Sequence, residues 1–286
     1  MNPGIYYDLS EREYRQAPGV SQSALKAIAR SPAHYRAGLV ADDEDTEAKQ
    51  IGRIAAALIL EKQREPWWIL KPDNISLNEK EGKDWAREAL KWDDAKDGKF
   101  PRSAKDAFAI KGIELVSASV FNTAAGVATA LVDSKKPEVR ALLDDAQCEV
   151  SVFADCETPS GVVRCKCRPD IVPNKSNCLS DLKTTSDARP SAFLRSIRRF
   201  GYAIQGASYV RHWNTVSPDD PREIFLLLAV EKEPPFAHCV YQLDADFMRE
   251  GLDEYMRLLN LYAFCEAMNE WPDYEPGIVT LSPYEK

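Results

Sequence analysis

The first part of the chain has apolar positions at helical spacing. Ser21 or Ser23 fits the N-cap of a helix whose apolar face includes Leu25. This helix is expected to end before Pro32, because the residue ahead of a proline is pushed out of the α region. A second helix is predicted after the acidic run at 42–45. The N-terminal segment is therefore expected to be mainly helical.

The next segment, from about 66 to 145, also favours helices. A short strand is predicted at 67–70. Apolar residues from Ile113 to Leu131 then recur at roughly helical spacing. These positions predict further helices before the first long strand.

The pattern changes to strands after this segment. Residues 149–154 and 161–172 alternate between the two faces of a strand, and 178–182 predicts a third short strand. We expect these three segments to form a meander. Two helices are predicted to follow, at about 190–199 and 202–214.

A buried strand and a long helix complete the pattern. Ile224–Val230 is a continuous apolar run, which is typical of a strand buried on both faces. Residues 236–243 are placed to pair with it, and Asp244 or Asp246 is expected to open the helix. Because strands alternate with helices, the sequence predicts an α/β class.

The domain organisation follows from these patterns. We expect a single domain over residues 1–286, with a mostly helical N-terminal part (1–145) and a sheet with flanking helices (146–286). A length of 286 residues is compatible with one enzyme core carrying helical additions.

Composition limits the classes of partner. The formal net charge of -8 argues against non-specific coating of nucleic acid, but it is compatible with a local basic groove and with carboxylates gathered around metal ions. There is no run of eighteen apolar residues, and the start of the chain does not resemble a signal peptide. We therefore expect no membrane association and a cytoplasmic location.

The seven cysteines are an odd number, which argues against a disulfide framework in an intracellular protein. Cys165 and Cys167 alternate along a predicted strand, and no CxxC pair is present. Structural zinc usually has four ligands in tighter pairs, and an iron–sulfur cluster needs four thiolates together. The sequence therefore favours buried, unreactive cysteines and predicts no iron–sulfur cluster.

Candidate chemistry lies on the predicted meander. Asp170 ends one strand, and after ten residues Asp181 and Lys183 lie on the next. Side chains at i and i+2 of a strand face the same way, so Asp181 and Lys183 point into one site. Asp170 can meet them there, and Glu149 can supply a third carboxylate. An exposed salt-bridge set on a sheet face is the structural alternative.

This residue set suits phosphodiester hydrolysis. The reaction needs a nucleophilic hydroxide and stabilisation of negative charge on the phosphate and the leaving oxygen. Carboxylates alone would repel the phosphate, whereas Mg²⁺ ions held by carboxylates reverse the local field. Lys183 can orient the attacking water and offset charge on the phosphate.

The flanking residues resemble a known family. Cys167-Arg168-Pro169-Asp170 followed by Asp181-Leu182-Lys183-Thr184-Thr185 is similar to the C-R-P-D…D-x-K-T-T segment of RecE-type exonucleases (exonuclease VIII), within the PD-(D/E)XK, RecB-like nuclease superfamily. The resemblance extends from about residue 4 to the Trp271-Pro272 region. It includes four further segments: Gly4–Leu9, Gly19–Leu25, Ser31–Tyr35, and Tyr202–Tyr209, which looks like the Y-x-x-Q-x-x-x-Y helix of RecB-family nucleases.

This resemblance implies a PD-(D/E)XK core, a central mixed sheet flanked by helices, and roles for individual residues. The implied metal ligands are Glu149, Asp170, Asp181 and the Leu182 carbonyl, for Mg²⁺ with Mn²⁺ as a substitute. Lys183 would be the catalytic lysine. Gln205 and Tyr209 would line the site and position DNA or the metal-bound water, although core packing also explains their helical spacing. Ser21 and Ser23 would hold a terminal phosphate.

Two features bear on activity. The family usually has G-T-A-x-H in its second conserved helix, where the histidine contributes to the metal site. Here Ala56 occupies that position, and none of the three histidines lies in the segment. The basic residues Arg195, Arg198 and Arg199 follow the catalytic strand and are candidates for DNA phosphates, with a solvated helix face as the alternative.

The resemblance implies a metal-dependent exodeoxyribonuclease that digests double-stranded DNA from an end, in the 5′ to 3′ direction. The product would be a 3′ single-stranded tail for a single-strand annealing protein in phage recombination. A homo-oligomeric ring in the cytoplasm of a bacterial host is also implied. Ala56 motivates an alternative, a catalytically impaired DNA-end-binding or partner-recruiting module. A RecB-like nuclease of another polarity or substrate is a further alternative.

Overall fold

The structure of the protein is a computed structural model, which describes residues 1–39, 46–61, 66–274 and 277–278. The acidic run at 42–45 lies outside these residues. The strands are β1 Gly4–Tyr6, β2 Val20–Ser21, β3 Trp68–Leu70, β4 Glu114–Val116, β5 Ala146–Cys148, β6 Ser151–Thr158, β7 Gly161–Cys167, β8 Ile171–Pro173, β9 Cys178–Thr185, β10 Ile224–Glu231 and β11 His238–Gln242. The helices are α1 Glu11–Gln16, α2 Gln22–Arg30, α3 Pro32–Gly38, α4 Glu47–Leu60, α5 Lys80–Ala89, α6 Asp94–Asp97, α7 Ala104–Lys111, α8 Ala118–Val132, α9 Pro137–Leu143, α10 Pro190–Phe200, α11 Tyr202–Val216 and α12 Ala245–Met268.

A five-stranded mixed sheet forms the centre of the molecule, in the order β11-β10-β9-β8-β5. Strands β9 and β10 are parallel, and the other neighbouring pairs are antiparallel. The side chains of β10 alternate between two cores: Leu228 and Val230 pack with α4 and α8, and Phe225 and Leu227 pack with α10 and α11. This arrangement confirms the predicted α/β class and the strand buried on both faces.

A long bent hairpin joins this sheet to a second one, with the order β1-β6-β7-β2. Strand β5 continues into β6, and β7 continues into β8. At the bend, Glu149 has a φ of 54°, which is uncommon for a residue other than glycine. Backbone hydrogen bonds from Glu149 N to Asp170 O (3.0 Å) and from Val150 N to Pro169 O (3.2 Å) keep the two arms together there. Helices α2 and α12 pack on the second sheet.

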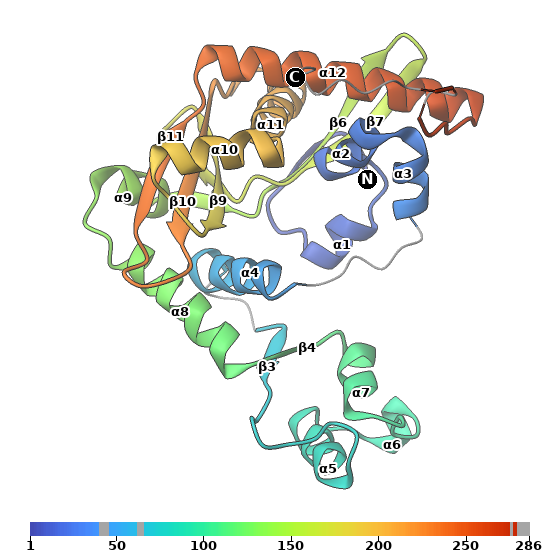
Figure 1. The fold of residues 1–286 in the computed structure, drawn as a ribbon, viewed down its shortest axis with the longest axis vertical. Coiled ribbons are helices and arrows are strands. Elements are labelled where there is room, and N and C mark those ends of the chain that lie inside the picture. The colour runs from blue at the N-terminus through green and yellow to red at the C-terminus, as the bar shows by residue number, and fades with distance from the viewer. Residues whose placement is uncertain (40–45, 62–65, 275–276, 279–286) are drawn as a thin grey trace.

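A small lobe projects from the sheet layers (Figure 1). It contains the parallel pair β3–β4 and helices α5, α6 and α7. Its own core is formed by Ala86, Ala104 and Phe108, with Trp85 packed against Phe108. The lobe is thus a local unit inserted between α4 and α8.

Several element boundaries differ from the sequence prediction. The helical pattern expected from Ile113 to Leu131 splits into β4 and α8, because Ser117 caps the helix by accepting a hydrogen bond from Val120 N (3.3 Å). The strand expected at 149–154 is interrupted by the bend, and its regular part begins at Ser151. Helix α12 begins after Asp244, whose side chain accepts from Phe247 N (2.9 Å). Within the described residues, no helix is long and apolar enough to cross a membrane.

Candidate active site

Asp170 and Leu182 meet where β8 and β9 separate. The two strands pair at Ile171 and Ser180, and beyond that point Leu182 N donates to Asp170 Oδ2 at 2.7 Å. The N–H and C=O of one residue point toward the same edge of a strand. The Leu182 carbonyl therefore faces the same edge of β9 as the Asp170 carboxylate.

Asp181 lies beside them and is nearly inaccessible, with 3% of its surface exposed. Its Oδ1 accepts a hydrogen bond from Gln205 Nε2 on α11 at 3.0 Å. Its Oδ2 accepts from the Lys183 ammonium, as expected from their i, i+2 spacing. The Lys183 ammonium also lies 4.8 Å from the centre of the Tyr202 ring. The side chains of Asp181, Lys183 and Gln205 thus form one connected group.

Glu149 lies at the hairpin bend and is paired with Arg168. The Arg168 Nε donates to Glu149 Oε2 at 2.7 Å, and both side chains are largely buried. Burial raises the pKa of Glu149 to about 7, and the Arg168 guanidinium opposes that rise. The charge of Glu61, which follows α4, raises it further. One oxygen of the largely buried Glu149 carboxylate is therefore already engaged by the Arg168 guanidinium.

The carboxylates repel one another. Burial raises the pKa of Asp170 well above its ordinary range, and the negative charges of Asp181 and Glu149 raise it further. A bound divalent cation would relieve this repulsion. Carboxylate and carbonyl oxygens are also the donors that Mg²⁺ prefers.

The fit to a metal ion is best for Asp170, Asp181 and the Leu182 carbonyl. Glu149, Asp170 and Asp181 are all described, and they do not bring one oxygen each within 4.8 Å of one another. One oxygen of Glu149 is engaged by the Arg168 guanidinium. The residues present therefore offer a site for a hard cation centred on the β8–β9 divergence.

Tyr209 lies one helical turn beyond Gln205, at the border of this group. Its ring packs edge-on against Phe225, with the ring centroids 5.9 Å apart. Burial raises the pKa of Tyr209 well above its ordinary value, and the charge of Asp181 contributes in the same direction. The phenol is therefore held neutral near the carboxylates.

The two candidate serines lie in different environments. Ser21 is the N-cap of α2, and its side chain accepts from Ala24 N at 3.3 Å. Ser23 is exposed on the first turn of the same helix. The structure thus gives Ser21 a capping function and leaves the Ser23 hydroxyl open to solvent.

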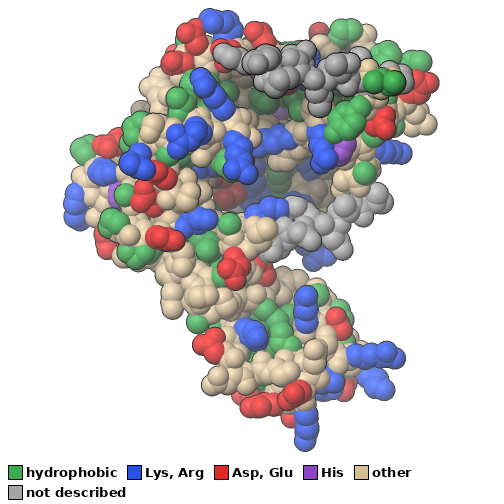
Figure 2. All heavy atoms as spheres, viewed as in Figure 1, with side chains coloured by type: hydrophobic (Ala, Val, Ile, Leu, Met, Phe, Trp, Pro, Cys, Tyr) green, Lys and Arg blue, Asp and Glu red, His purple; other side chains and the backbone are tan. Residues whose placement is uncertain are grey.

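The three candidate arginines are exposed on α10 and do not pair with the site carboxylates. Arg195 donates to the Ser191 carbonyl at 3.0 Å, and Arg199 lies 5.4 Å from the Phe200 ring centre. Figure 2 shows Lys and Arg side chains gathered over α10 and along the border of a hollow between α10 and α4. The guanidinium groups are therefore free to meet an external anion.

Lys26 on α2 is a site neighbour that the sequence did not predict. Although the residue is exposed, loss of hydration at its ammonium lowers its pKa to about 8, and the nearby charge of Lys183 adds to the shift. Lys26 Cε also lies near Gly201, where α10 meets α11. No sequence signal distinguishes one lysine on a helix, because its proximity to Lys183 arises only from the packing of α2.

Helix α4 packs on the face of β9 opposite the Asp181 and Lys183 side chains, close to Thr184. A Cβ on Gly52 would lie 3.3 Å from Thr184 Oγ1, so the helix backbone runs close to β9. Near the other end, the charge of Glu61 acts on Glu149. Ala56 lies one turn after Gly52, half-buried and without a ligating group. The expected histidine position therefore offers no donor atom, and Ala56 packs against the core that α4 and α8 share.

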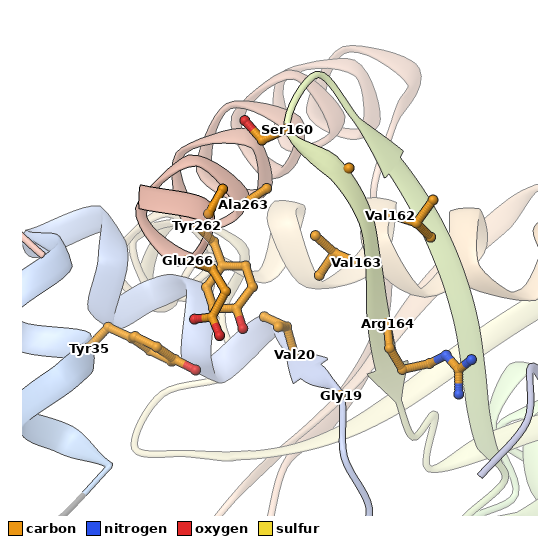
Figure 3. Close-up of a pocket in the computed structure, with 12 residues that line it drawn as sticks. Gly19, Val20, Tyr35, Ser160, Val162, Val163, Arg164, Tyr262, Ala263 and Glu266 are labelled. Atoms are coloured by element: carbon orange, nitrogen blue, oxygen red, sulfur yellow. The ribbon is translucent and has the colours of Figure 1, made fainter. Parts of the chain in front are cut away.

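A separate pocket lies away from these carboxylates. It has a volume of about 390 Å³ and is bordered by β7, α12 and the segment before α2 (Figure 3). Its lining includes Val20, Tyr35, Val163 and Glu266, and it contains none of the predicted catalytic residues. The candidate active site is thus the carboxylate group at the strand divergence and not this pocket.

The mixed sheet, with Asp170 immediately before β8 and Asp181-x-Lys183 on the adjacent β9, defines the fold of a PD-(D/E)XK nuclease core. Residues 21–279 match a family described as a PDDEXK-like domain of unknown function (DUF3799), and the chain belongs to that family.

A solved structure shares this fold. It is named "Putative exonuclease" from Eubacterium rectale and has a TM-score of 0.57, with 14% identity over 92% of this chain and 88% of that chain. A structure named SSO0001 matches at a TM-score of 0.30, with 14% identity over 73% of this chain and 86% of that chain. No curated protein matches the chain.

Proposed function

We propose that this protein is a Mg²⁺-dependent exonuclease that digests double-stranded DNA from an end. The carrying observation is the group of buried Asp181 with half-buried Asp170 and Lys183, in which Gln205 donates to Asp181. The family membership and the name of the Eubacterium rectale neighbour support the same reaction class.

Each residue has a distinct part in the proposed reaction. Asp170, Asp181 and the Leu182 carbonyl would hold Mg²⁺, which would supply activation of water and offset negative charge on the scissile phosphate. Gln205 orients Asp181 through its hydrogen bond, and Lys183 positions the attacking water and faces the phosphate oxygens. Lys26 and the arginines of α10 bind the flanking phosphates. Tyr209, held neutral, lines the DNA path.

The finer features of the proposal rest on similarity to RecE-type exonucleases. We propose 5′ to 3′ polarity, with Mn²⁺ replacing Mg²⁺, and a 3′ single-stranded product for a single-strand annealing protein. The setting would be phage recombination in the bacterial cytoplasm. A homo-oligomeric ring would keep a protein of net charge -8 on its substrate, because only the residues lining the channel need to be basic.

Digestion of a linear duplex tests the activity and its direction. The duplex is 5′-phosphorylated and labelled at the 5′ end in one sample and at the 3′ end in another, with Mg²⁺ or Mn²⁺ present. We expect early release of labelled mononucleotide from the 5′ end, and loss of release in Asp181→Ala and Lys183→Ala. Release that persists in both variants would contradict the assigned site, and early 3′ release would reverse the proposed polarity.

One observation favours a second candidate function, a DNA-end-binding or partner-recruiting module without efficient hydrolysis. Ala56 lies on α4, at the position where relatives of the RecE type carry a histidine. If the chain is disabled there, the wild type releases no nucleotide with either metal and Ala56→His restores release. Activity in the wild type would remove this candidate.

A further inference from the structure

Four side chains that the proposed reaction does not use meet in the interior beside the second sheet. Cys156 on β6 and Cys165 on β7 lie on the face of the hairpin that packs against α11 and α12. His212 of α11 joins them, and the ligand atoms of these three residues all lie within 4.8 Å of one another. Tyr255 of α12 contributes its hydroxyl to the same point.

Two of the three distances from the Tyr255 hydroxyl match the edges of a tetrahedral metal site. Tyr255 Oη lies 2.8 Å from His212 Nε2, 3.4 Å from Cys165 Sγ and 3.7 Å from Cys156 Sγ. Zinc bonds of about 2.3 Å to sulfur and 2.0 Å to nitrogen or oxygen place tetrahedral ligand atoms roughly 3.3–3.8 Å apart. Both contacts to sulfur fall in that range. The contact between Tyr255 Oη and His212 Nε2 is shorter, because these two atoms form a hydrogen bond.

Hydrogen bonding alone does not account for these buried groups. Each of the four residues has at most 2% of its surface exposed. His212 Nδ1 has no hydrogen-bond partner among the described residues, whereas buried polar atoms are normally paired.

We propose that Cys156, Cys165, His212 and Tyr255 bind one structural zinc ion, independent of the nuclease site. Two thiolates and an imidazole suit a borderline-soft cation and not Mg²⁺. The ion would tie the β6–β7 hairpin to α11 and α12. The site could not be predicted from the sequence, because its ligands come from four elements and include no CxxC pair.

The pocket in Figure 3 offers a route to this site. Val163 is the cross-strand partner of Cys156, and Val20 is the partner of Cys165. Both valines line the pocket, where Val163 points from β7 toward α12. Solvent in the pocket therefore comes within one strand position of each thiol, which gives a cation a short path inward.

Cobalt substitution tests the proposal on the full-length chain. Purified protein is stripped with chelator, kept reduced with a phosphine, and titrated with Co²⁺. We expect intense thiolate-to-cobalt and tetrahedral d–d absorption, saturating at one ion per chain and displaced by Zn²⁺. Asp181→Ala should leave the thiolate band unchanged, because oxygen ligands give no sulfur-to-cobalt charge transfer. Zinc should also raise the Tm of stripped protein by about 5 °C or more.

The matched variants are Cys156→Ser/Cys165→Ser and Tyr255→Phe, with Cys239→Ser and Cys265→Ser as controls distant from the cluster. The double variant should lose the thiolate band, Tyr255→Phe should fold and show an altered d–d spectrum, and the controls should match the wild type. Absence of a thiolate band in the folded wild type would overturn the proposal. A disulfide between the two cysteines under reducing conditions, seen as five free thiols instead of seven after denaturation, would overturn it as well.

Discussion

At the scale of single residues, Asp181 divides its two oxygens between unlike partners. Gln205 donates to one oxygen from α11, and Lys183 donates to the other from the same strand. A neutral amide and a cation therefore fix the direction of one carboxylate. The orientation of this acid depends on a helix that does not itself carry a carboxylate of the site.

This arrangement gives a prediction for Gln205. Substitution of Gln205 by Ala removes the orienting hydrogen bond, and we expect the hydrolysis rate at limiting Mg²⁺ to fall about 10–100-fold, as for other residues that orient a ligand. The measurement is nucleotide release as a function of Mg²⁺ concentration.

The control for this variant is Gln242→Ala, which changes an exposed glutamine on β11. A higher Mg²⁺ requirement with an unchanged unfolding midpoint would identify an orienting role. Equal Mg²⁺ dependence in the wild type and Gln205→Ala would refute it.

At the scale of elements, α11 and α12 approach closely at Gly251. A Cβ added there would meet the Ala203 carbonyl oxygen at 2.2 Å, and the obstacle is backbone that cannot rotate away. The close approach allows α12 to cover α11, which carries Gln205 and His212. Glycine is therefore required at this position by packing and not by its own φ.

We expect Gly251→Ala to lower the free energy of unfolding by about 1–3 kcal/mol, because a methyl group must force the helices apart. Gly38→Ala is the matched control, since a Cβ there meets nothing within 4 Å and alanine favours helix. Urea denaturation of both variants measures the difference. Similar midpoints for the two would show that the helices separate at little cost.

The periodic elements could be predicted from the sequence, but the interruptions could not. The apolar run of β10 and the helices α10 and α11 follow from spacing alone, because packing repeats along each of them. The division between β4 and α8 depends on one serine cap, and the bend at Glu149 depends on a single backbone angle. These local features do not change the spacing of the hydrophobic residues, so that spacing cannot predict them.

The same distinction applies to the candidate site. The spacing of Asp170, Asp181 and Lys183 predicted their meeting, because adjacent strands bring fixed positions together. Arg168 reaches Glu149 only because the hairpin bends there. Lys26 comes close to Lys183 from a separate helix. His212 and Tyr255 likewise reach the cysteines only after two helices pack on the hairpin. Tertiary neighbours of this kind carry no periodic signal.

At the scale of the whole molecule, an acidic chain presents basic side chains around one hollow. The net charge is -8, yet Figure 2 shows Lys and Arg side chains over α10 and beside α4. Only charges near the phosphates release counterions on binding. The overall repulsion of DNA and a local attraction can therefore coexist.

Replacing Arg195, Arg198 and Arg199 together by Ala should weaken duplex binding and make it less sensitive to salt. The slope of log K against log salt is expected to become shallower by about 0.9 for each phosphate that the variant no longer neutralises. Fluorescence anisotropy with end-labelled duplex at several salt concentrations measures the slope.

The exposed basic residues of the small lobe, Lys99, Arg102 and Lys105, provide a control of equal charge. Their triple replacement by Ala changes the net charge by the same amount and should leave the slope as in the wild type. An equally shallow slope in both triple variants would indicate a general charge effect and not a defined path over α10.

The bent hairpin also limits how this chain can vary in length. Cys165 and Asp170 lie five positions apart on one arm of the hairpin. The bend separates the part that packs against α12 from the part that carries the carboxylate. Inserting or deleting a single residue between them would turn the following side chains to the opposite face of the strand. Either Asp170 would lose its contact with Leu182 of β9, or Cys165 would lose its contact with Tyr255 of α12. Between Cys165 and Asp170, the chain should therefore tolerate substitutions more readily than insertions or deletions.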